Sequence, residues 1–322
     1  MIAQPDPPSQ SAIERLAIDR IGAPLESIEP LSGGAWSSAW GVRVRDRDLV
    51  IRWSVVDEDF HKDERATHFG SPALPVPRVL EIGPAHDGWY AISERHFGDV
   101  LEELDAPATR AVLPSLLGML DALRSAPISD SHGFGPWDAT GDGIHPSWKS
   151  ALLAIGTDSA DRRSHGWRAR LDERRPSAAA VFEAAYASLG GVAPDLPETR
   201  HVIHGDLLNR NVLVENDQIS AVLDWGSAMY GDFLFDVAWF DFWSAWHQQL
   251  QEVGVVQAAL DHLESAGVDL PQRDARLFAC NLFVGLDGIS YLAWRGWDEP
   301  LDWTTRRLAE ILDLGPTRRA DR

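Results

Sequence analysis

Three polar residues with oxygen atoms suited to binding a metal lie close together in one stretch of the sequence: Asp206, Asn211 and Asp224. Between Asn211 and Asp224 the chain has two short apolar runs around a polar turn at residues 215–218, which is typical of a β-hairpin. Because a hairpin brings its two ends together, we expect Asn211 and Asp224 to be neighbours, with Asp206 beside them. Two carboxylates and an amide oxygen suit a hard cation such as Mg²⁺, which usually takes its other ligands from water and nucleotide phosphates.

These three residues also have a simpler interpretation. Asp and Asn are common in turns and at strand ends, because their side chains bind nearby backbone groups. That interpretation suffices for any one of them alone. All three at this spacing, with His204 and Gly205 directly before Asp206, favour a functional site.

The charge of the chain limits its possible partners. The 322 residues include 29 basic and 49 acidic ones, for a net charge of −20. A nucleic-acid-binding protein needs a basic face, so we expect no nucleic-acid partner. An acidic cleft would attract a cationic small molecule, although acidic surfaces also serve solubility alone.

The remaining composition predicts a cytoplasmic protein. Cys280 is the only cysteine, so no internal disulfide can form. The first residues contain neither a basic segment nor an apolar run of the kind found in secretory signals. No stretch approaches the length of a membrane span, so we expect no membrane partner. We also expect a monomer.

Residues 1–93 are predicted to form an N-terminal β lobe of five strands with one or two helices. The strands are expected at residues 28–31, 41–45, 49–53, 78–82 and 89–93. The turn after the first strand contains Ser32, Gly33 and Gly34, whose backbone N–H groups could lie over phosphates. The same glycines would also fit a plain hairpin turn.

Two cations of this lobe could bind phosphate groups. Arg52 alternates with Val50 and Ile51 on the third strand, so its side chain is expected to face away from theirs, under the glycine turn. Lys62 lies on a predicted helix at residues 60–69, which also carries Asp63 and Glu64, and is the alternative.

Residues 94–98 are predicted to be a hinge, and residues 99–322 a mostly helical C-terminal lobe that carries the hairpin. Helices are expected at residues 108–126, from residue 148, and at residues 178–189, with a loop at residues 132–143. The predicted architecture is therefore α+β and bilobal.

The order of these features resembles a known family. His204-Gly-Asp-Leu-Leu-Asn-Arg-Asn211, followed by Asp224-Trp-Gly and Gly231-Asp232, is similar to the catalytic segment of the aminoglycoside phosphotransferases. The resemblance implies a protein-kinase-like fold, a small antiparallel N-lobe and a larger helical C-lobe. Segments 68–83, 133–136 and 285–287 are most similar to members that act on hygromycin B-like aminocyclitols.

The resemblance also implies roles for individual residues. Asp206 would be the catalytic base that orients the acceptor hydroxyl, and Asn211 and Asp224 would hold Mg²⁺ between the phosphates of ATP. His204 and Asp236 would have structural roles. Backbone atoms near Ser93, Glu94 and His96 would hold adenine.

One departure from the kinase pattern concerns the phosphate ligand. The usual strand lysine is replaced by Arg52, which is longer and planar, so the geometry need not be the same. Lys62 is the alternative ligand, and Glu64 is the expected helix partner of the cation.

For a cationic acceptor, carboxylates would pair with ammonium groups and aromatic faces would stack on sugar rings. For each aromatic residue taken singly, core packing is the better explanation. As a set, acidic residues interleaved with tryptophan favour an acceptor site. Asp287 is the preferred acceptor contact. The candidates in the helical lobe are Asp241, Asp287, Asp298, Glu299 and Asp302, with Trp239, Trp243, Trp246, Trp294 and Trp297.

Three functional hypotheses follow. The first is an ATP-dependent transferase, a kinase that moves the γ-phosphate to a hydroxyl of an aminoglycoside and so confers antibiotic resistance. The second is a related kinase acting on choline, a macrolide, a sugar or another metabolite. The third, a non-catalytic binding protein, is disfavoured because Asp206, Asn211 and Asp224 are all present.

Overall fold

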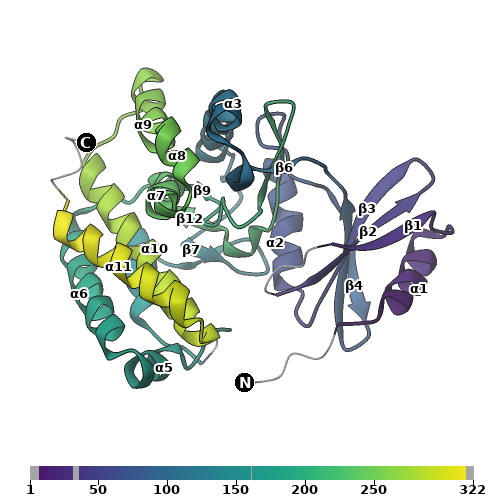
Figure 1. Cartoon of the computed structure of the whole chain (residues 1–322), viewed down its shortest axis with the longest axis horizontal. Helices are drawn as coiled ribbons and strands as arrows, with labels where there is room; N and C mark the ends of the chain where they lie inside the picture. Colours follow the sequence, from purple (N-terminus) through teal and green to yellow (C-terminus); the bar gives the residue numbers. More distant parts are fainter. Residues whose placement is uncertain (1–6, 32–35, 161, 317–322) are drawn as a thin grey trace.

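The computed structural model describes residues 7–31, 36–160 and 162–316. In this part of the chain a β-rich lobe and a larger helical lobe lie side by side, with α2 (Glu58–Ala66) between them (Figure 1). The predicted bilobal α+β architecture is confirmed.

The β-rich lobe is one antiparallel sheet in the order β1-β2-β3-β5-β4. Leu49, Ile51 and Trp53 alternate along β3 and are buried in a core shared with α1 (Gln10–Ile21). Arg52, between two of them, therefore faces the opposite side of the sheet. It faces away from Ile51 as predicted, but it shares its side of the sheet with Val50, contrary to the prediction, and both residues line the interlobe cleft. The strands are β1 (Ser27–Leu31), β2 (Ser38–Val44), β3 (Arg47–Ser54), β4 (Val79–Ala85) and β5 (Gly88–Glu94).

The predicted hairpin is formed by β10 (Val212–Glu215) and β11 (Gln218–Val222). Its turn residues Asn216 and Asp217 have φ angles of 52° and 59°, the left-handed region that a tight two-residue hairpin turn requires. The short strand β6 (Asp99–Val100), which follows the hinge, pairs with β10 and completes a three-stranded sheet.

The region 132–143, predicted to be a loop, contains strands. A four-stranded sheet runs in the order β8-β7-β12-β9. Gly133 and Gly135, with φ of 68° and 74°, flank Phe134 in this irregular pairing, which explains why local sequence gave no strand signal. The strands are β7 (Phe134–Trp137), β8 (Gly143–His145), β9 (His201–Ile203) and β12 (Met229–Gly231).

The helical lobe is built around α10 (Arg273–Arg295), which packs against four other helices, α5, α6, α7 and α11. By length and composition α10 could cross a membrane, contrary to the expectation that no stretch approaches that length. However, 72% of its apolar window is buried inside the protein, so its apolar residues form part of the core. The other helices are α3 (Ala106–Ser125), α4 (Trp148–Leu153), α5 (Trp167–Arg174), α6 (Pro176–Val192), α7 (Leu234–Trp243), α8 (Gln248–Val253), α9 (Val255–Ser265) and α11 (Asp298–Leu314).

Two buried contacts tie these parts together. Ala66 at the end of α2, with Phe69 beyond it, packs into the core of the helical lobe, so α2 belongs to the interface between the lobes. In the helical lobe, Asp232 after β12 and Arg276 on α10 form a fully buried, bidentate ion pair with both N–O distances at 2.7 Å.

Candidate active site

The two ends of the hairpin meet as predicted. The backbone N–H of Leu223 donates to the carbonyl of Asn211 over 2.7 Å, which places Asp224 beside the start of β10. The Asn211 side-chain amide donates to the carbonyl of Asp206 over 2.9 Å. All three predicted residues are therefore brought to one place.

Asp206 lies in a half-buried position at the centre of the site. Burial raises the pKa of its carboxyl to about 8, and the negative charges of Asp224 and Glu102 add to the effect. Hydrogen bonds from Asn209 and Asn211 act in the opposite direction, and the Asn209 amide lies 2.6 Å from Oδ1 of Asp206. A carboxyl with a raised pKa is well suited to accept a proton near neutral pH.

His204 holds the loop and does not face the cleft. Its Nε2–H donates to the carbonyl of Leu223 over 2.9 Å, and its Nδ1 accepts from the backbone N–H of Asp206 over 3.2 Å. Both ring nitrogens are therefore used, and burial lowers the pKa of the imidazole to about 4, so the ring is neutral. This arrangement agrees with the structural role predicted for His204.

Asp236 supports the same loop from α7. Its two carboxylate oxygens accept the backbone N–H groups of His204 and Gly205 over 3.0 Å and 2.9 Å. Gly205 has a φ of 77°, which favours glycine at this turn. Burial raises the pKa of Asp236 to about 6, and the two N–H donors partly oppose this shift.

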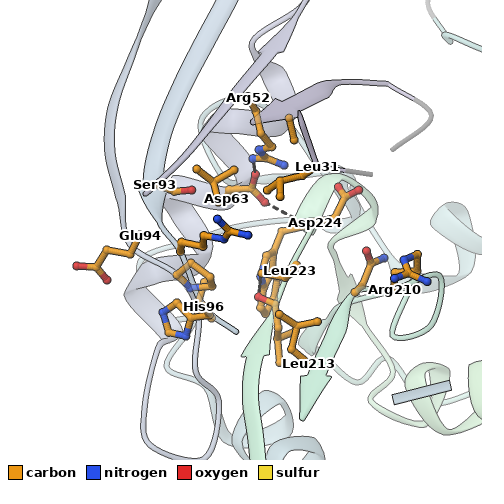
Figure 2. A pocket seen from close by; sticks show the side chains of 18 of the residues that line it. Leu31, Arg52, Asp63, Ser93, Glu94, His96, Arg210, Leu213, Leu223 and Asp224 are labelled. Carbon is orange, nitrogen blue, oxygen red and sulfur yellow. Dashed lines mark hydrogen bonds and ion pairs between the residues drawn. The ribbon is translucent and has the colours of Figure 1, made fainter. Parts of the chain in front are cut away.

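A cleft of about 500 Å³ lies between the lobes, directly against the hairpin. Arg52, Asp63 and Asp224 line one side, and Ser93 and His96 line the other (Figure 2). Glu94 also borders the cleft, but its side chain points outward and is 3.5 Å from Arg78. The predicted hinge residues are thus placed where they could meet a bound base.

The partner of Arg52 differs from the prediction. Arg52 forms an ion pair with Asp63, whereas Glu64 lies at the surface beside His61. Asp63 also accepts the backbone N–H of Trp225 over 2.9 Å, so α2 is fixed to the chain just after the hairpin. Burial lowers the pKa of Arg52, and nearby acidic groups, Asp224 first among them, oppose this.

Lys62 does not line the cleft, contrary to its candidacy as phosphate ligand. Its ammonium group is buried, donates to the carbonyl of Gly226 over 3.1 Å and pairs with Glu58 over 2.7 Å. The structure therefore favours Arg52 as the cation that faces a bound phosphate. Ser32, Gly33 and Gly34 lie outside the described residues.

The donor atoms present fit a magnesium ion. No hydrogen bond to the Asp224 carboxylate is found within the described ranges, and this group is exposed to the cleft. Asn211 uses its amide nitrogen on Asp206, which leaves its amide oxygen for a cation. One carboxylate, from Asp224, and one amide oxygen, from Asn211, would therefore be the protein ligands of the ion.

Near Asp206, α10 carries an acidic and aromatic group of side chains, here termed the α10 cluster: Asp287, Tyr291 and Trp294. The charges of Asp206 and Asp287 both contribute to raising the pKa of Tyr291, whose main cause is burial, so Tyr291 lies within electrostatic reach of both carboxylates. Trp36, at the start of the described chain before β2, stacks on Trp294 with ring centroids 5.2 Å apart.

Several predicted acceptor residues lie elsewhere. Trp239 is 8% exposed and packs between Phe235 and Trp243, so its ring belongs to the core. Trp243 is also packed among aromatic rings, although it lies 3.7 Å from the position of a Cβ built on Gly288, beside Asp287.

The other acidic candidates mostly serve ion pairs within the helical lobe. Asp241 accepts from the Asn281 amide over 3.0 Å. Asp298 pairs with Arg175 over 3.1 Å, and Asp302 pairs with the same arginine over 3.5 Å. Glu299 lies exposed in the first turn of α11. Of the predicted acceptor carboxylates, Asp287 is the one that lies near Tyr291 in the α10 cluster.

Several residues that the structure places around the candidate site were not predicted from the sequence. Glu102 accepts the backbone N–H of Arg210, and its second carboxylate oxygen is buried without a hydrogen bond. Tyr291 and Trp36 were not singled out either. Asn209 could have been found, because an amide three positions after Asp206 can reach back to its carboxylate.

Comparisons with known proteins agree with this geometry. A model of the phosphotransferase enzyme family matches residues 27–273. The hygromycin-B 4-O-kinase of Escherichia coli is 32% identical over 307 residues, which cover 95% of this chain and 86% of that protein.

Solved structures show the same relationship. The crystal structure of the aminoglycoside phosphotransferase APH(4)-Ia is 30% identical, with a TM-score of 0.82 over 95% of this chain and 99% of that chain. A thermostable mutant of that protein, solved with AMP-PNP and hygromycin B, is 32% identical with a TM-score of 0.81, over 94% and 99% of the two chains. The GDP complex of aminoglycoside 2'-phosphotransferase-IIIa, at 15% identity and a TM-score of 0.65 over 95% and 99%, shares the fold.

The match to the family model covers most of the chain, and the catalytic segment, the interlobe cleft and the acidic residues at the hairpin lie together as a phosphotransferase requires. The chain therefore belongs to the phosphotransferase enzyme family that includes the aminoglycoside kinases.

Proposed function

We propose that this protein transfers the γ-phosphate of ATP to a hydroxyl of an aminocyclitol aminoglycoside similar to hygromycin B. The observation that carries the proposal is the position of Asp206, whose carboxyl lies within electrostatic reach of Asp224 at the interlobe cleft and of Tyr291 beside Asp287. A carboxylate in this position can meet an acceptor hydroxyl on one side and a phosphate on the other.

The nucleotide is proposed to lie in the cleft with its phosphates between Arg52 and the end of the hairpin. Asn211 and Asp224 would hold Mg²⁺, which when bound neutralises charge on the phosphates. Arg52 contributes a fixed positive charge on the side of the β lobe, and Asp63 holds its guanidinium in place. Homologous structures bind AMP-PNP or ADP, which supports ATP as the donor.

The acceptor is proposed to bind against Asp287, with its hydroxyl directed to Asp206. Asp287 carries the charge that an ammonium group requires, and Tyr291 and Trp294 offer ring faces for sugars. The net charge of −20 favours the approach of a polycation. Asp206 would orient the hydroxyl and accept its proton, which a carboxylate can do because proton loss comes late in phosphoryl transfer.

An acceptor screen tests this proposal. Purified protein with ATP and Mg²⁺ is incubated separately with hygromycin B, spectinomycin, choline and a macrolide, and each product is examined by mass spectrometry. We expect the addition of one phosphoryl group to hygromycin B and none to choline. Phosphorylation of choline without modification of any aminoglycoside would contradict the proposal and support the alternative kinase.

A second prediction separates the two candidate phosphate ligands. Because Arg52 lines the cleft, Arg52→Gln is expected to weaken AMP-PNP binding by about tenfold, the cost of losing a charge-assisted contact. Lys62→Met, which removes the contacts to Gly226 and Glu58, is expected to lower the melting temperature more than the affinity. Isothermal titration calorimetry and thermal unfolding of both variants measure these effects, and the reverse pattern would assign the phosphates to Lys62.

A further inference from the structure

A short segment of the helical lobe contacts α2 and the chain that precedes β2. The described residues between the 3-10 turn at Ala154–Gly156 and α5, residues 157–160 and 162–166, are here termed the strap. Asp158 accepts the backbone N–H groups of Gly166 and Arg168 over 2.9 Å and 3.2 Å. These two hydrogen bonds join Asp158, near the beginning of the strap, to the backbone at its end and at the start of α5.

Arg163 of the strap binds two carboxylates in the first turn of α2. Its two terminal nitrogens donate to the two carboxylate oxygens of Asp59 over 2.6 Å and 2.9 Å, and one of them also lies 3.3 Å from Glu58. The bidentate pair fixes the orientation of the guanidinium as well as its position. The carboxylates raise the pKa of Arg163 against the effect of burial, so the group stays charged.

Arg163 also contacts the chain that follows the predicted glycine turn. Its guanidinium lies over the ring of Trp36, 5.5 Å from the centroid. Trp36 in turn stacks on Trp294 of α10. In the sequence Trp36 comes two positions after Gly34. One arginine thus joins α2, the start of the described chain before β2, and the helical lobe.

The acidic partner of Arg163 lies next to the proposed phosphate site. A Cβ built on Gly226 would lie 3.2 Å from the Asp59 carboxylate and 3.3 Å from that of Asp224. The charge of Asp59 also acts on Arg52. Without Arg163, Asp59 would present an uncompensated negative charge close to the phosphates.

We infer that Arg163 is a positioning residue of the nucleotide site, which holds the β-rich lobe through Trp36 and neutralises Asp59 beside Asp224. The inference requires the phosphotransferase family but not a particular acceptor. It assigns to the strap a role in nucleotide binding, although no strap residue lines the cleft. Arg162, directly before Arg163 in the sequence, pairs with Asp287 over 3.5 Å, so the same strap also contacts the α10 cluster.

The test compares AMP-PNP affinity in two arginine variants. Arg168 lies just after the strap and also makes an ion pair and stacks on an aromatic ring, but with Glu183 and Trp167, inside the helical lobe. Arg163→Gln is expected to weaken AMP-PNP binding about tenfold, the cost of one charged contact, while Arg168→Gln stays within about twofold. Arg163→Lys keeps the charge without the bidentate geometry, so its AMP-PNP affinity is expected to lie between those of wild type and Arg163→Gln.

A double mutant shows whether Asp59 transmits the effect. Because Asp59→Asn removes the uncompensated charge, Arg163→Gln combined with Asp59→Asn is expected to bind AMP-PNP more tightly than Arg163→Gln alone. Melting temperatures report whether each variant is folded, and hydrogen exchange of α2 reports loosening of its first turn. Equal affinities for Arg163→Gln and Arg168→Gln, or no recovery in the double mutant, would overturn the inference. Neither result depends on which acceptor is phosphorylated.

Discussion

Replacing Asp206 with asparagine is expected to lower kcat for phosphoryl transfer by about three orders of magnitude, the usual contribution of a positioned acid–base group. Asparagine keeps the shape of the side chain but cannot accept the proton of the acceptor hydroxyl. Because Asp206 does not line the cleft, the Kd for AMP-PNP should stay within a few-fold of wild type. This corresponds to a change in binding free energy of about 1 kcal/mol at most. Steady-state kinetics and calorimetry measure the two quantities.

A matched control is available on the same hairpin. Asp217 lies exposed in the turn with a φ of 59°, a conformation that asparagine also adopts readily. Asp217→Asn makes the same chemical change and should leave both kcat and affinity unchanged. Full activity in Asp206→Asn would remove the catalytic assignment, and loss of AMP-PNP binding would show that Asp206 supports the nucleotide instead.

The same variant makes a prediction about pH. The pKa of Asp206 is raised from its ordinary value of 3.8 to about 8, so the folded protein favours the protonated carboxyl. That contribution to stability is complete below the ordinary pKa and is lost as the pH rises through about 8. Asparagine does not titrate, so Asp206→Asn should gain stability relative to wild type, by about 1–3 kcal/mol between pH values of about 5.5 and 9. Parallel stability curves for the two proteins would contradict the raised pKa.

The catalytic hairpin could be predicted because its signals are local. Two apolar runs around Asn216 and Asp217 determine both the turn and the register, and the register determines that Asn211 and Asp224 meet. The structural roles predicted for His204 and Asp236 stay predictions, and the hydrogen bonds that these residues make to the loop could be seen only in the structure.

Predicting the partner of Arg52 depends on which face of α2 is buried. Glu64 and Asp63 differ by one position, which turns the side chain by about 100° around the helix axis. The apolar residues Phe60 and Ala66 are buried, and Asp63 lies on the same face, three positions from each. This spacing was a usable signal for Asp63 over Glu64.

The acceptor side could not be predicted residue by residue. Trp239 and Trp294 are both helical tryptophans near acidic residues, yet one is in the core and the other stacks on Trp36 from the β-rich lobe. Arg163 and Asp59 are 104 positions apart, and no local pattern pairs them. Such contacts depend on how the two lobes pack, which hydrophobic periodicity does not encode.

The second large effect concerns stability. Arg276 and Asp232 are each 1% exposed, and two 2.7 Å contacts join them. Arg276→Ala would leave the Asp232 carboxylate buried without its cation, which costs about 3–5 kcal/mol. For a chain of this size that loss corresponds to a fall of about 10 °C in melting temperature. Thermal and denaturant unfolding measure it.

The control is an ion pair of the same length at the surface. Arg43 and Asp48 are also 2.7 Å apart, but their side chains are 48% and 26% exposed, so Arg43→Ala should cost about 1 kcal/mol or less. Combining Arg276→Met with Asp232→Asn removes both charges and should recover part of the loss. If Arg276→Ala and Arg43→Ala lower the free energy of unfolding by the same amount, the buried pair stabilises the protein no more than the surface pair does.

The position of this pair connects stability to activity. Asp232 follows β12 directly and also accepts the backbone N–H of Leu234 over 3.0 Å, at the start of α7. Asp236, in the first turn of α7, binds the backbone N–H groups of His204 and Gly205 beside Asp206. Loss of Arg276 should therefore loosen the support of the catalytic loop before the lobe unfolds. In Arg276→Ala, phosphotransferase activity is accordingly expected to fall at a lower temperature than global unfolding, whereas in Arg43→Ala the two should coincide.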